Sequence, residues 1–196
     1  MTYTPVRYRS YQEYLDDERL NSESNYRLLD TGELIEVASE DDINLRIAME
    51  LAFALFSQFP HLKKLIRVNS KEMEVEPVGD RCINRKPDLV VLQPEHLETA
   101  RQAITLDQLP PQFIAELVSP GAESSDNYLR DYVWKRSQYE KLGVPEYWIV
   151  DPHRQRVTVL VLTDGSYEET VFEGDSAIAS RCFPELALRT RELLVG

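Results

Sequence analysis

The chain has 196 residues, of which 42% are hydrophobic and 29% are charged, and its formal net charge is −12. This composition is that of an ordinary globular domain and excludes a chain that is disordered throughout. The negative charge argues against tight non-specific binding of nucleic acid, but it leaves room for a local basic groove or a metal ion. We expect one domain over residues 1–196, which includes an N-terminal helix and hairpin at about 10–37.

No stretch of the sequence is long enough to cross a bilayer. The most apolar run, residues 47–56, is interrupted by Glu50 and is shorter than the about 20 residues that a membrane span needs. The N-terminal residues lack the apolar region of a signal peptide. Cys82 and Cys182 match no zinc spacing. We therefore expect a cytoplasmic protein with reduced thiols and no membrane partner.

The first half of the chain predicts two helices and a hairpin. Ser10 and Glu13 form a capping-box pattern, which favours the start of a short helix. Two apolar runs flank Gly32, as in a hairpin. Apolar residues then recur every four positions from Ile43 to Leu55, which predicts a longer helix. The expected elements are a helix over 11–18, a hairpin over 26–37 and a helix over 43–59.

The second half predicts strands interrupted by one helix. Gly143 follows the helical pattern at a position that commonly ends a helix. The expected elements are strands over 65–69, 72–76, 88–92 and 112–118, a helix over 127–142, and strands over 146–150, 156–162 and 167–172. This order is typical of an α/β fold with a mixed β-sheet flanked by helices.

Two carboxylates fall inside strands that are otherwise apolar. Glu116 shares its strand face with Ile114 and Val118, and the opposite face is apolar as well. Asp88 opens the apolar strand 88–92 in the same way. Burying a carboxylate costs several kcal/mol unless it is paired or bound to a metal. Both residues are therefore candidates for a site.

A lysine shares the inward stripe of the third helix. A helical wheel places Lys135 among aromatic residues, and Asp131 lies one turn before it. A buried ammonium group needs an anionic partner, and Asp88 and Glu116 are the strongest candidates. The stripe consists of Tyr128, Tyr132, Lys135, Tyr139 and Leu142.

These three residues predict a metal-dependent hydrolytic site. Asp88 and Glu116 could bind Mg²⁺ or Mn²⁺, with the backbone carbonyl of Leu117 as a further ligand. Lys135 would orient or deprotonate the attacking water and stabilise developing negative charge. The residues alone leave open a buried ion-pair cluster without chemistry. A glycosidase acid–base pair is a third interpretation, but Lys135 argues against it, because a nearby cation favours two charged carboxylates.

The same residues resemble the PD-(D/E)XK nuclease motif, with one departure. The lysine of that motif normally lies two residues after the glutamate, where this chain has Val118. The chain is similar to the Uma family, the second of that name, in which the lysine lies on the following helix. The most specific match is GVPEYWIVDP together with the upstream lysine. The matching segments are Tyr26–Val37, Arg85–Val91, Ile114–Pro120, Asp131–Asp151 and Phe183–Leu186.

The resemblance implies a restriction-endonuclease-like fold and a nuclease that hydrolyses phosphodiester bonds. It implies Mg²⁺ or Mn²⁺ as cofactor, nucleic acid as partner, with DNA favoured over RNA, and a homodimer as a plausible assembly. It also implies an N-terminal glutamate near the metal, for which Glu33 is the first choice and Glu36 the second. Many members have a histidine where this chain has Asn44.

Two further residues of the helix, Tyr139 and Asp131, are additional candidates for the site. The alternative function is a nucleic-acid-associated or protein-binding module that keeps the nuclease fold without cutting. The acidic net charge and the lack of basic patches in the sequence support that alternative.

Overall fold

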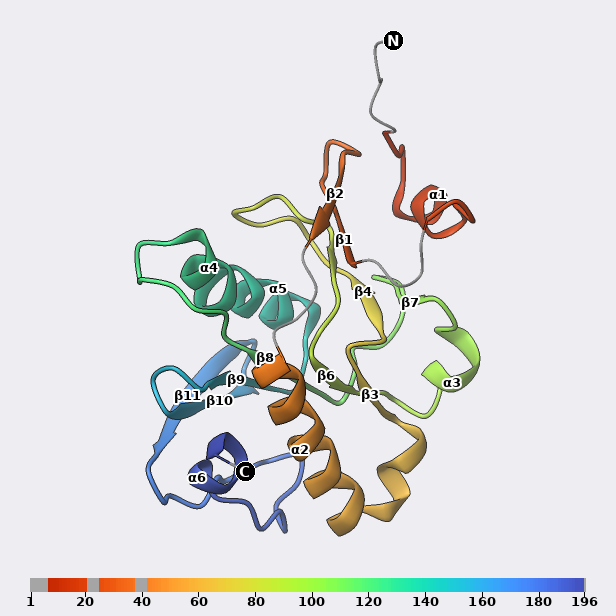
Figure 1. The fold of residues 1–196 in the computed structure, drawn as a ribbon. Coiled ribbons are helices and arrows are strands. Elements are labelled where there is room, and N and C mark those ends of the chain that lie inside the picture. Colours follow the sequence, from red (N-terminus) through yellow and green to blue (C-terminus); the bar gives the residue numbers. More distant parts are fainter. Residues whose placement is uncertain (1–6, 21–24, 38–41, 196) are drawn as a thin grey trace.

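The computed structural model describes residues 7–20, 25–37 and 42–195. Its centre is a six-stranded mixed sheet (Figure 1). The strands are β3 (Ile66–Val68), β6 (Leu89–Val91), β8 (Phe113–Leu117), β9 (Glu146–Asp151), β10 (Arg156–Thr163) and β11 (Ser166–Glu173). They lie in the order β11-β10-β9-β8-β6-β3, and only the β8–β9 pair of this sheet is parallel. The predicted α/β fold with a mixed sheet flanked by helices is confirmed.

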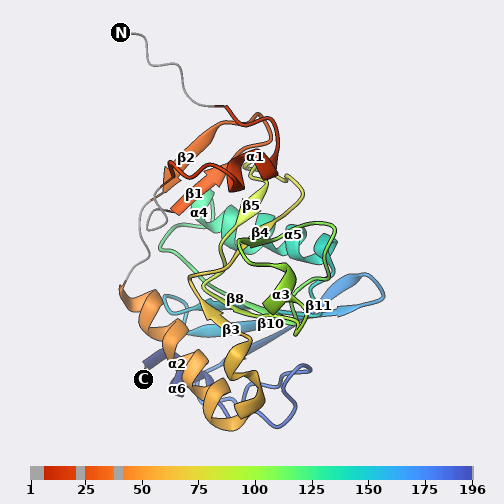
Figure 2. The ribbon, with the colours of Figure 1, turned by 90° about the vertical axis from the view of Figure 1, so that its right-hand side faces the viewer.

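Helices cover both faces of this sheet (Figure 2). One face carries α2 (Asp42–Gln58) and α6 (Thr190–Val195). The other carries a continuous helix that links β8 to β9, so that a parallel strand pair is joined by a helical crossover. That helix consists of α4 (Asp126–Tyr128), the π-helical η2 (Leu129–Trp134) and α5 (Lys135–Leu142). Within the described ranges, no helix is long and apolar enough to cross a membrane.

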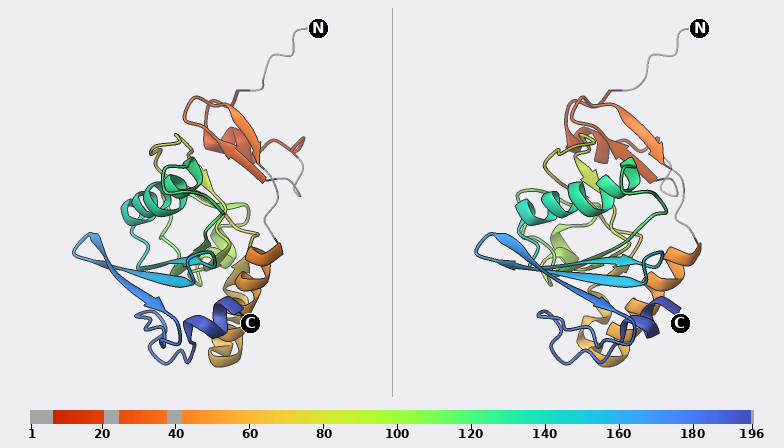
Figure 3. Two further views of the ribbon diagram at one scale, coloured as in Figure 1. Left: turned by 60° about the vertical axis from the view of Figure 1, so that its left-hand side comes forward. Right: turned by 90° about the vertical axis from the view of Figure 1, so that its left-hand side faces the viewer.

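A smaller N-terminal layer lies beyond the crossover helix (Figure 3). It contains a two-stranded hairpin and a small three-stranded sheet. The Glu72 carboxylate accepts hydrogen bonds from Tyr11, Tyr14 and Asn84, and thereby ties the first helix to the small sheet. The elements are α1 (Tyr11–Leu15), β1 (Asn25–Leu28), β2 (Leu34–Val37), β4 (Glu72–Glu74), β5 (Asn84–Arg85) and β7 (Ala103–Ile104). Two short helices, η1 (Pro60–Lys64) and α3 (His96–Thr99), complete the fold.

The local patterns predicted most elements, and three details differ. The Ser10 hydroxyl caps α1 by accepting from the Glu13 N–H, but the helix ends at Leu15 instead of residue 18. The strands expected at 65–69 and 72–76 exist, but they belong to different sheets. The helix expected at 127–142 contains a π-helical segment. Gly143 ends it in the left-handed conformation, with φ of 82°.

A buried carboxylate attaches the C-terminal tail to the sheet. Glu146 of β9 is fully buried. Its Oε1 accepts from the Trp148 indole N–H and the Ser180 hydroxyl. Its Oε2 accepts from the backbone N–H groups of Arg181 and Cys182. Four donors therefore share one carboxylate. If an NH₂ group replaced either oxygen, two of these donors would lose their acceptor.

Replacing Glu146 with glutamine should destabilise the fold by about 2–4 kcal/mol. The amide nitrogen cannot accept hydrogen bonds, so two buried donors lose their charged acceptor. Urea unfolding of Glu146→Gln measures the change. Glu169→Gln is the matched control, because Glu169 pairs with Arg136 at an exposed site on β11 and such pairs contribute at most about 1 kcal/mol. Equal stability of the two variants would contradict the anchoring role.

Candidate active site

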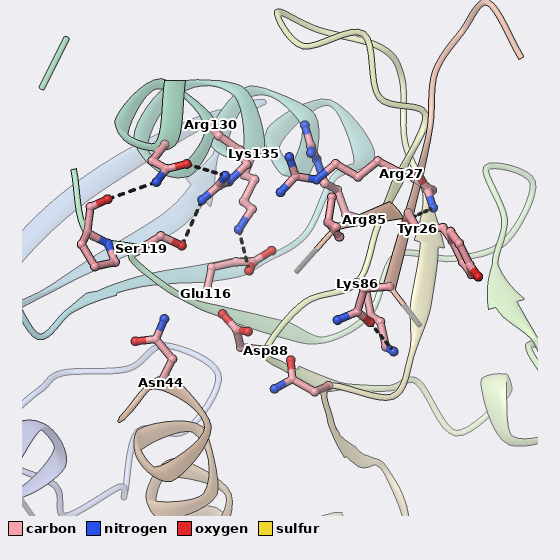
Figure 4. Close-up of a pocket in the computed structure, with 16 residues that line it drawn as sticks. Tyr26, Arg27, Asn44, Arg85, Lys86, Asp88, Glu116, Ser119, Arg130 and Lys135 are labelled. Carbon is pink, nitrogen blue, oxygen red and sulfur yellow. Dashed lines mark hydrogen bonds and ion pairs between the residues drawn. The ribbon is translucent and has the colours of Figure 1, made fainter. Parts of the chain in front are cut away.

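Asp88 and Glu116 lie opposite each other on neighbouring strands. The β6–β8 pairing joins Leu89 to Ala115, and one step further along this antiparallel register places Asp88 opposite Glu116. The two residues are 4% and 2% exposed, and Figure 4 shows their side chains side by side in one pocket. Asp88 Oδ2 accepts a hydrogen bond from the Leu117 N–H at 2.7 Å. The sheet register therefore brings together two carboxylates that are far apart in the sequence.

The Lys135 ammonium group lies against these carboxylates. Its Nζ is 2.9 Å from Glu116 Oε2 and 2.9 Å from Asp131 Oδ1. The Tyr139 hydroxyl donates to the other Glu116 oxygen, Oε1. Both oxygens of Glu116 are thus engaged within the protein. Each carboxylate oxygen has a further lone pair, so Glu116 can still accept another ligand.

The crossover helix contains a π-helical segment immediately before Lys135. A π-turn contains one more residue than an α-turn, and such segments are frequent at functional sites. Asp131 and Tyr139 are 1% and 0% exposed. Tyr128 and Tyr132 instead stack on each other, with ring centroids 4.5 Å apart, beneath the Arg154 guanidinium group. Tyr132, Tyr139 and Leu142 of the predicted inward stripe pack in or against the core, whereas Tyr128 lies at its edge.

The surrounding charges keep Lys135 protonated. Burial alone would lower the pKa of Lys135, but Asp131, Glu116 and Asp88 together raise it above its ordinary value. Burial and the Glu116 charge raise the pKa of Tyr139, so its hydroxyl stays neutral and donates. Of the two roles expected for Lys135, this arrangement favours orientation and charge stabilisation over proton abstraction.

The pocket around these residues is rich in cations. Its volume is about 440 Å³. It is lined by the cations Arg27, Arg85, Lys86, Arg130 and Lys135 and by the carboxylates Asp88 and Glu116. Arg85, Arg130 and Lys135 are ion-paired with Asp80, Asp131 and Glu116. Arg27 and Lys86 form no ion pair within the described residues, so they give the pocket a local excess of positive charge in a chain whose net charge is −12. The sequence did not reveal it, because the cations come from the hairpin, the β5 segment and the crossover helix.

The N-terminal glutamates lie outside this pocket. Glu33 forms an exposed ion pair with Arg7, and neither Glu33 nor Glu36 lines the pocket. The hairpin instead contributes Arg27. Asn44, at the start of α2, is 3% exposed and also lines the pocket. The position noted for its departure from the family pattern is thus close to Asp88 and Glu116 (Figure 4).

The donor atoms fit a hard divalent cation that completes its coordination with water and substrate. Among the described residues, no group of three or more His, Cys, Asp or Glu side chains is arranged to hold a metal. Mg²⁺ commonly uses only one or two carboxylates, together with waters and substrate phosphates. Asp88 and Glu116 would supply that pair. Because the Leu117 N–H points to Asp88, strand geometry directs the Leu117 carbonyl to the same side.

Replacing Asp131 with asparagine should destabilise the fold in a pH-dependent manner. Burial would raise the pKa of Asp131, but Lys135 and Arg130 lower it below its ordinary value of 3.8. Its contribution is therefore complete above about pH 4 and is lost as the pH falls through the folded-state pKa. Urea unfolding should show a deficit of about 1.5–3 kcal/mol for Asp131→Asn at pH 7 and a smaller one at pH 3. A deficit that does not change with pH would contradict the ion pairing.

Comparison with known proteins gives a consistent assignment. The family model "Uma2: Putative restriction endonuclease" matches residues 11–191. A comparison with curated proteins gave no match. A solved structure described as "a putative nuclease belonging to DUF820", from Anabaena variabilis, has a TM-score of 0.63 and 18% sequence identity, and the alignment covers 97% of this chain and 98% of that one. At that identity the structural likeness supports the fold alone. Because the family model spans nearly the whole chain, the protein belongs to the Uma2 family of restriction-endonuclease-like proteins.

Proposed function

We propose that the protein is a metal-dependent nuclease that hydrolyses phosphodiester bonds, with Asp88, Glu116 and Lys135 at its reaction centre. The observation that carries this proposal is the meeting of two buried carboxylates with a buried ammonium group in a pocket lined by cations. Phosphate groups are attracted to positive charge, and a chain with a net charge of −12 concentrates such charge in this pocket.

Each residue has a role that follows from its contacts. Asp88 and Glu116, with the Leu117 carbonyl, would hold Mg²⁺ or Mn²⁺. Such an ion lowers the pKa of a bound water molecule and stabilises the negative charge that develops on the phosphoryl group. The Lys135 ammonium group would donate to a phosphoryl oxygen or orient the water. Two positioning residues support them, because Tyr139 donates to Glu116 and Asp131 pairs with Lys135.

The finer features of this function concern the substrate, the cellular location and the assembly. The family description, a restriction endonuclease, favours DNA over RNA as substrate. Cys82 and Cys182 are free thiols, which agrees with action in the cytoplasm. A homodimer stays a prediction, which light scattering would check.

One observation favours the alternative of a binding module that keeps the nuclease fold without cutting. Glu116 already accepts from Lys135 and Tyr139, and Asp131 adds a second carboxylate to Lys135. The charges of this cluster are therefore partly compensated within the protein, as in a structural ion-pair network. The two functions differ in whether a divalent cation binds and in what the loss of Lys135 changes.

Mn²⁺ or Mg²⁺ should raise the melting temperature of the protein, because a ligand that binds only the folded state stabilises it. A hundredfold excess over Kd adds about 2.7 kcal/mol, or about 5–10 °C for a chain of this size. Asp88→Asn should abolish the shift. Asp164→Asn, in the exposed β10–β11 turn, should retain it. If the wild-type melting curve is unchanged in millimolar Mn²⁺, the metal-dependent proposal fails.

Replacing Lys135 with methionine separates a catalyst from a structural cluster. The two carboxylates line the pocket. If this pocket takes up a cation as proposed, Lys135→Met should stay folded and keep its stabilisation by Mn²⁺. Cleavage of labelled DNA should fall by at least about a hundredfold, the usual effect of removing a charge-stabilising group.

The control is Lys141→Met, because Lys141 lies on the same helix, is 49% exposed and does not line the pocket. It should cut at the wild-type rate. If Lys135→Met loses about 3–5 kcal/mol of stability whether or not Mn²⁺ is present, the cluster is structural. If the variant is folded and cuts normally, Lys135 has no part in the reaction.

A further inference from the structure

Arg27 carries a charge that has no direct partner in the described part of the protein. It lies on β1, is half-buried and lines the pocket. Within residues 7–20, 25–37 and 42–195, its guanidinium group forms neither a hydrogen bond nor an ion pair. A half-buried cation without a partner is costly. Its position is therefore easier to explain if an anion binds beside it.

Arg85 presents a second unsatisfied donor in the same pocket. It is only 4% exposed. Its Nε donates to Gln138 and its Nη2 to Asp80, which fixes the orientation of the guanidinium group. Its buried Nη1 has no partner in the described structure. Buried donors are nearly always satisfied, so a donor held rigidly in a pocket without an acceptor points to a ligand.

Arg130 adds a third guanidinium group from the crossover helix. It is held in place by Asp131, Ser119 and Asn127. Figure 4 shows Arg27 entering the pocket from the hairpin side and Arg130 from the helix, with Lys135 between them. Burial lowers the pKa of Arg27, and the like charges of Arg130 and Arg85 lower it further. Arg85 and Arg130 are paired with Asp80 and Asp131. A bound anion would therefore chiefly compensate the charge of Arg27.

We propose that Arg27, Arg85 and Arg130 form a subsite for a substrate phosphate other than the one that is hydrolysed. The proposal rests on the proposed nuclease function in taking nucleic acid as the source of that phosphate. With no described partner, the Arg27 guanidinium group can bind phosphate oxygens through two parallel hydrogen bonds. Arg85 and Arg130 are engaged by Asp80 and Asp131, so they add positive charge and single donors. The phosphate that reacts would lie beside Lys135, Asp88 and Glu116, whereas Arg27 reaches the pocket from the hairpin. The phosphate bound in this subsite is either an internal phosphodiester of the nucleic acid strand or its terminal 5′-phosphate.

Arg27→Gln is the cleanest variant, because Arg27 supports no other described side chain. Calorimetry in EDTA would compare three probes: a thymidine dinucleotide without terminal phosphate, the same dinucleotide with a 5′-phosphate, and the trinucleotide. In the wild type, a second phosphate should strengthen binding by about tenfold, the scale of one charged hydrogen-bond pair. In Arg27→Gln the gain should fall below about threefold. Arg101→Gln removes an equal charge from an exposed arginine outside the pocket and should keep the full gain.

The two sources give different patterns with these probes. A gain with both the 5′-phosphate and the trinucleotide supports a subsite for any backbone phosphate. A gain with the 5′-phosphate alone supports a subsite for a chain end. The absence of a gain in the wild type, or a full gain in Arg27→Gln, would overturn the proposal.

The readout is also independent of the reaction, because binding is measured in EDTA. A protein that shows the Arg27-dependent gain but never cuts retains the subsite and loses the nuclease function. A protein that cuts DNA but binds the probes with a second phosphate no more tightly keeps the nuclease function and lacks the subsite. Circular dichroism of Arg27→Gln would verify that the variant is folded before either result is used.

Discussion

The ammonium group of Lys135, buried between the crossover helix and the sheet, is the constraint on which the site depends. An isolated charge at this depth would be very unfavourable. Glu116 and Asp131 contact it directly, and Asp88 adds to the negative potential that keeps it charged. These contacts join β8 to the crossover helix. The same ion pairs therefore fix the position of the helix and define the pocket.

The backbone arrangement makes this meeting of charges possible. The antiparallel β6–β8 register places Asp88 opposite Glu116. The parallel β8–β9 pair requires a crossover connection, and that connection carries Asp131 and Lys135 over the same face. Asp131 and Lys135 are four residues apart, so both side chains lie on the same inward face of the helix. A site built from three elements in this way needs no sequence proximity between lysine and glutamate, which accounts for Val118 at the usual lysine position.

Charge is distributed unevenly over the molecule. The chain as a whole is acidic, yet its pocket is lined by more cations than carboxylates. An acidic exterior disfavours indiscriminate binding to nucleic acid, whereas a basic pocket attracts individual phosphate groups. The lack of basic patches in the sequence supported the alternative of a binding module that does not cut nucleic acid. The tertiary structure weakens that argument, because the basic residues gather only after folding.

The sequence by itself determined the elements and the buried charges. Alternating and four-residue periodicities are local, so they predicted the hairpin, α2, β8 and the helix that carries Lys135; the cost of burying Asp88 and Glu116 singled those residues out. Only the tertiary structure decided that β3 and β4 belong to different sheets, that the helix contains a π-turn, and that Arg27, Arg85 and Asn44 share a pocket with Lys135. These features depend on contacts between distant segments, which no local pattern in a single sequence encodes.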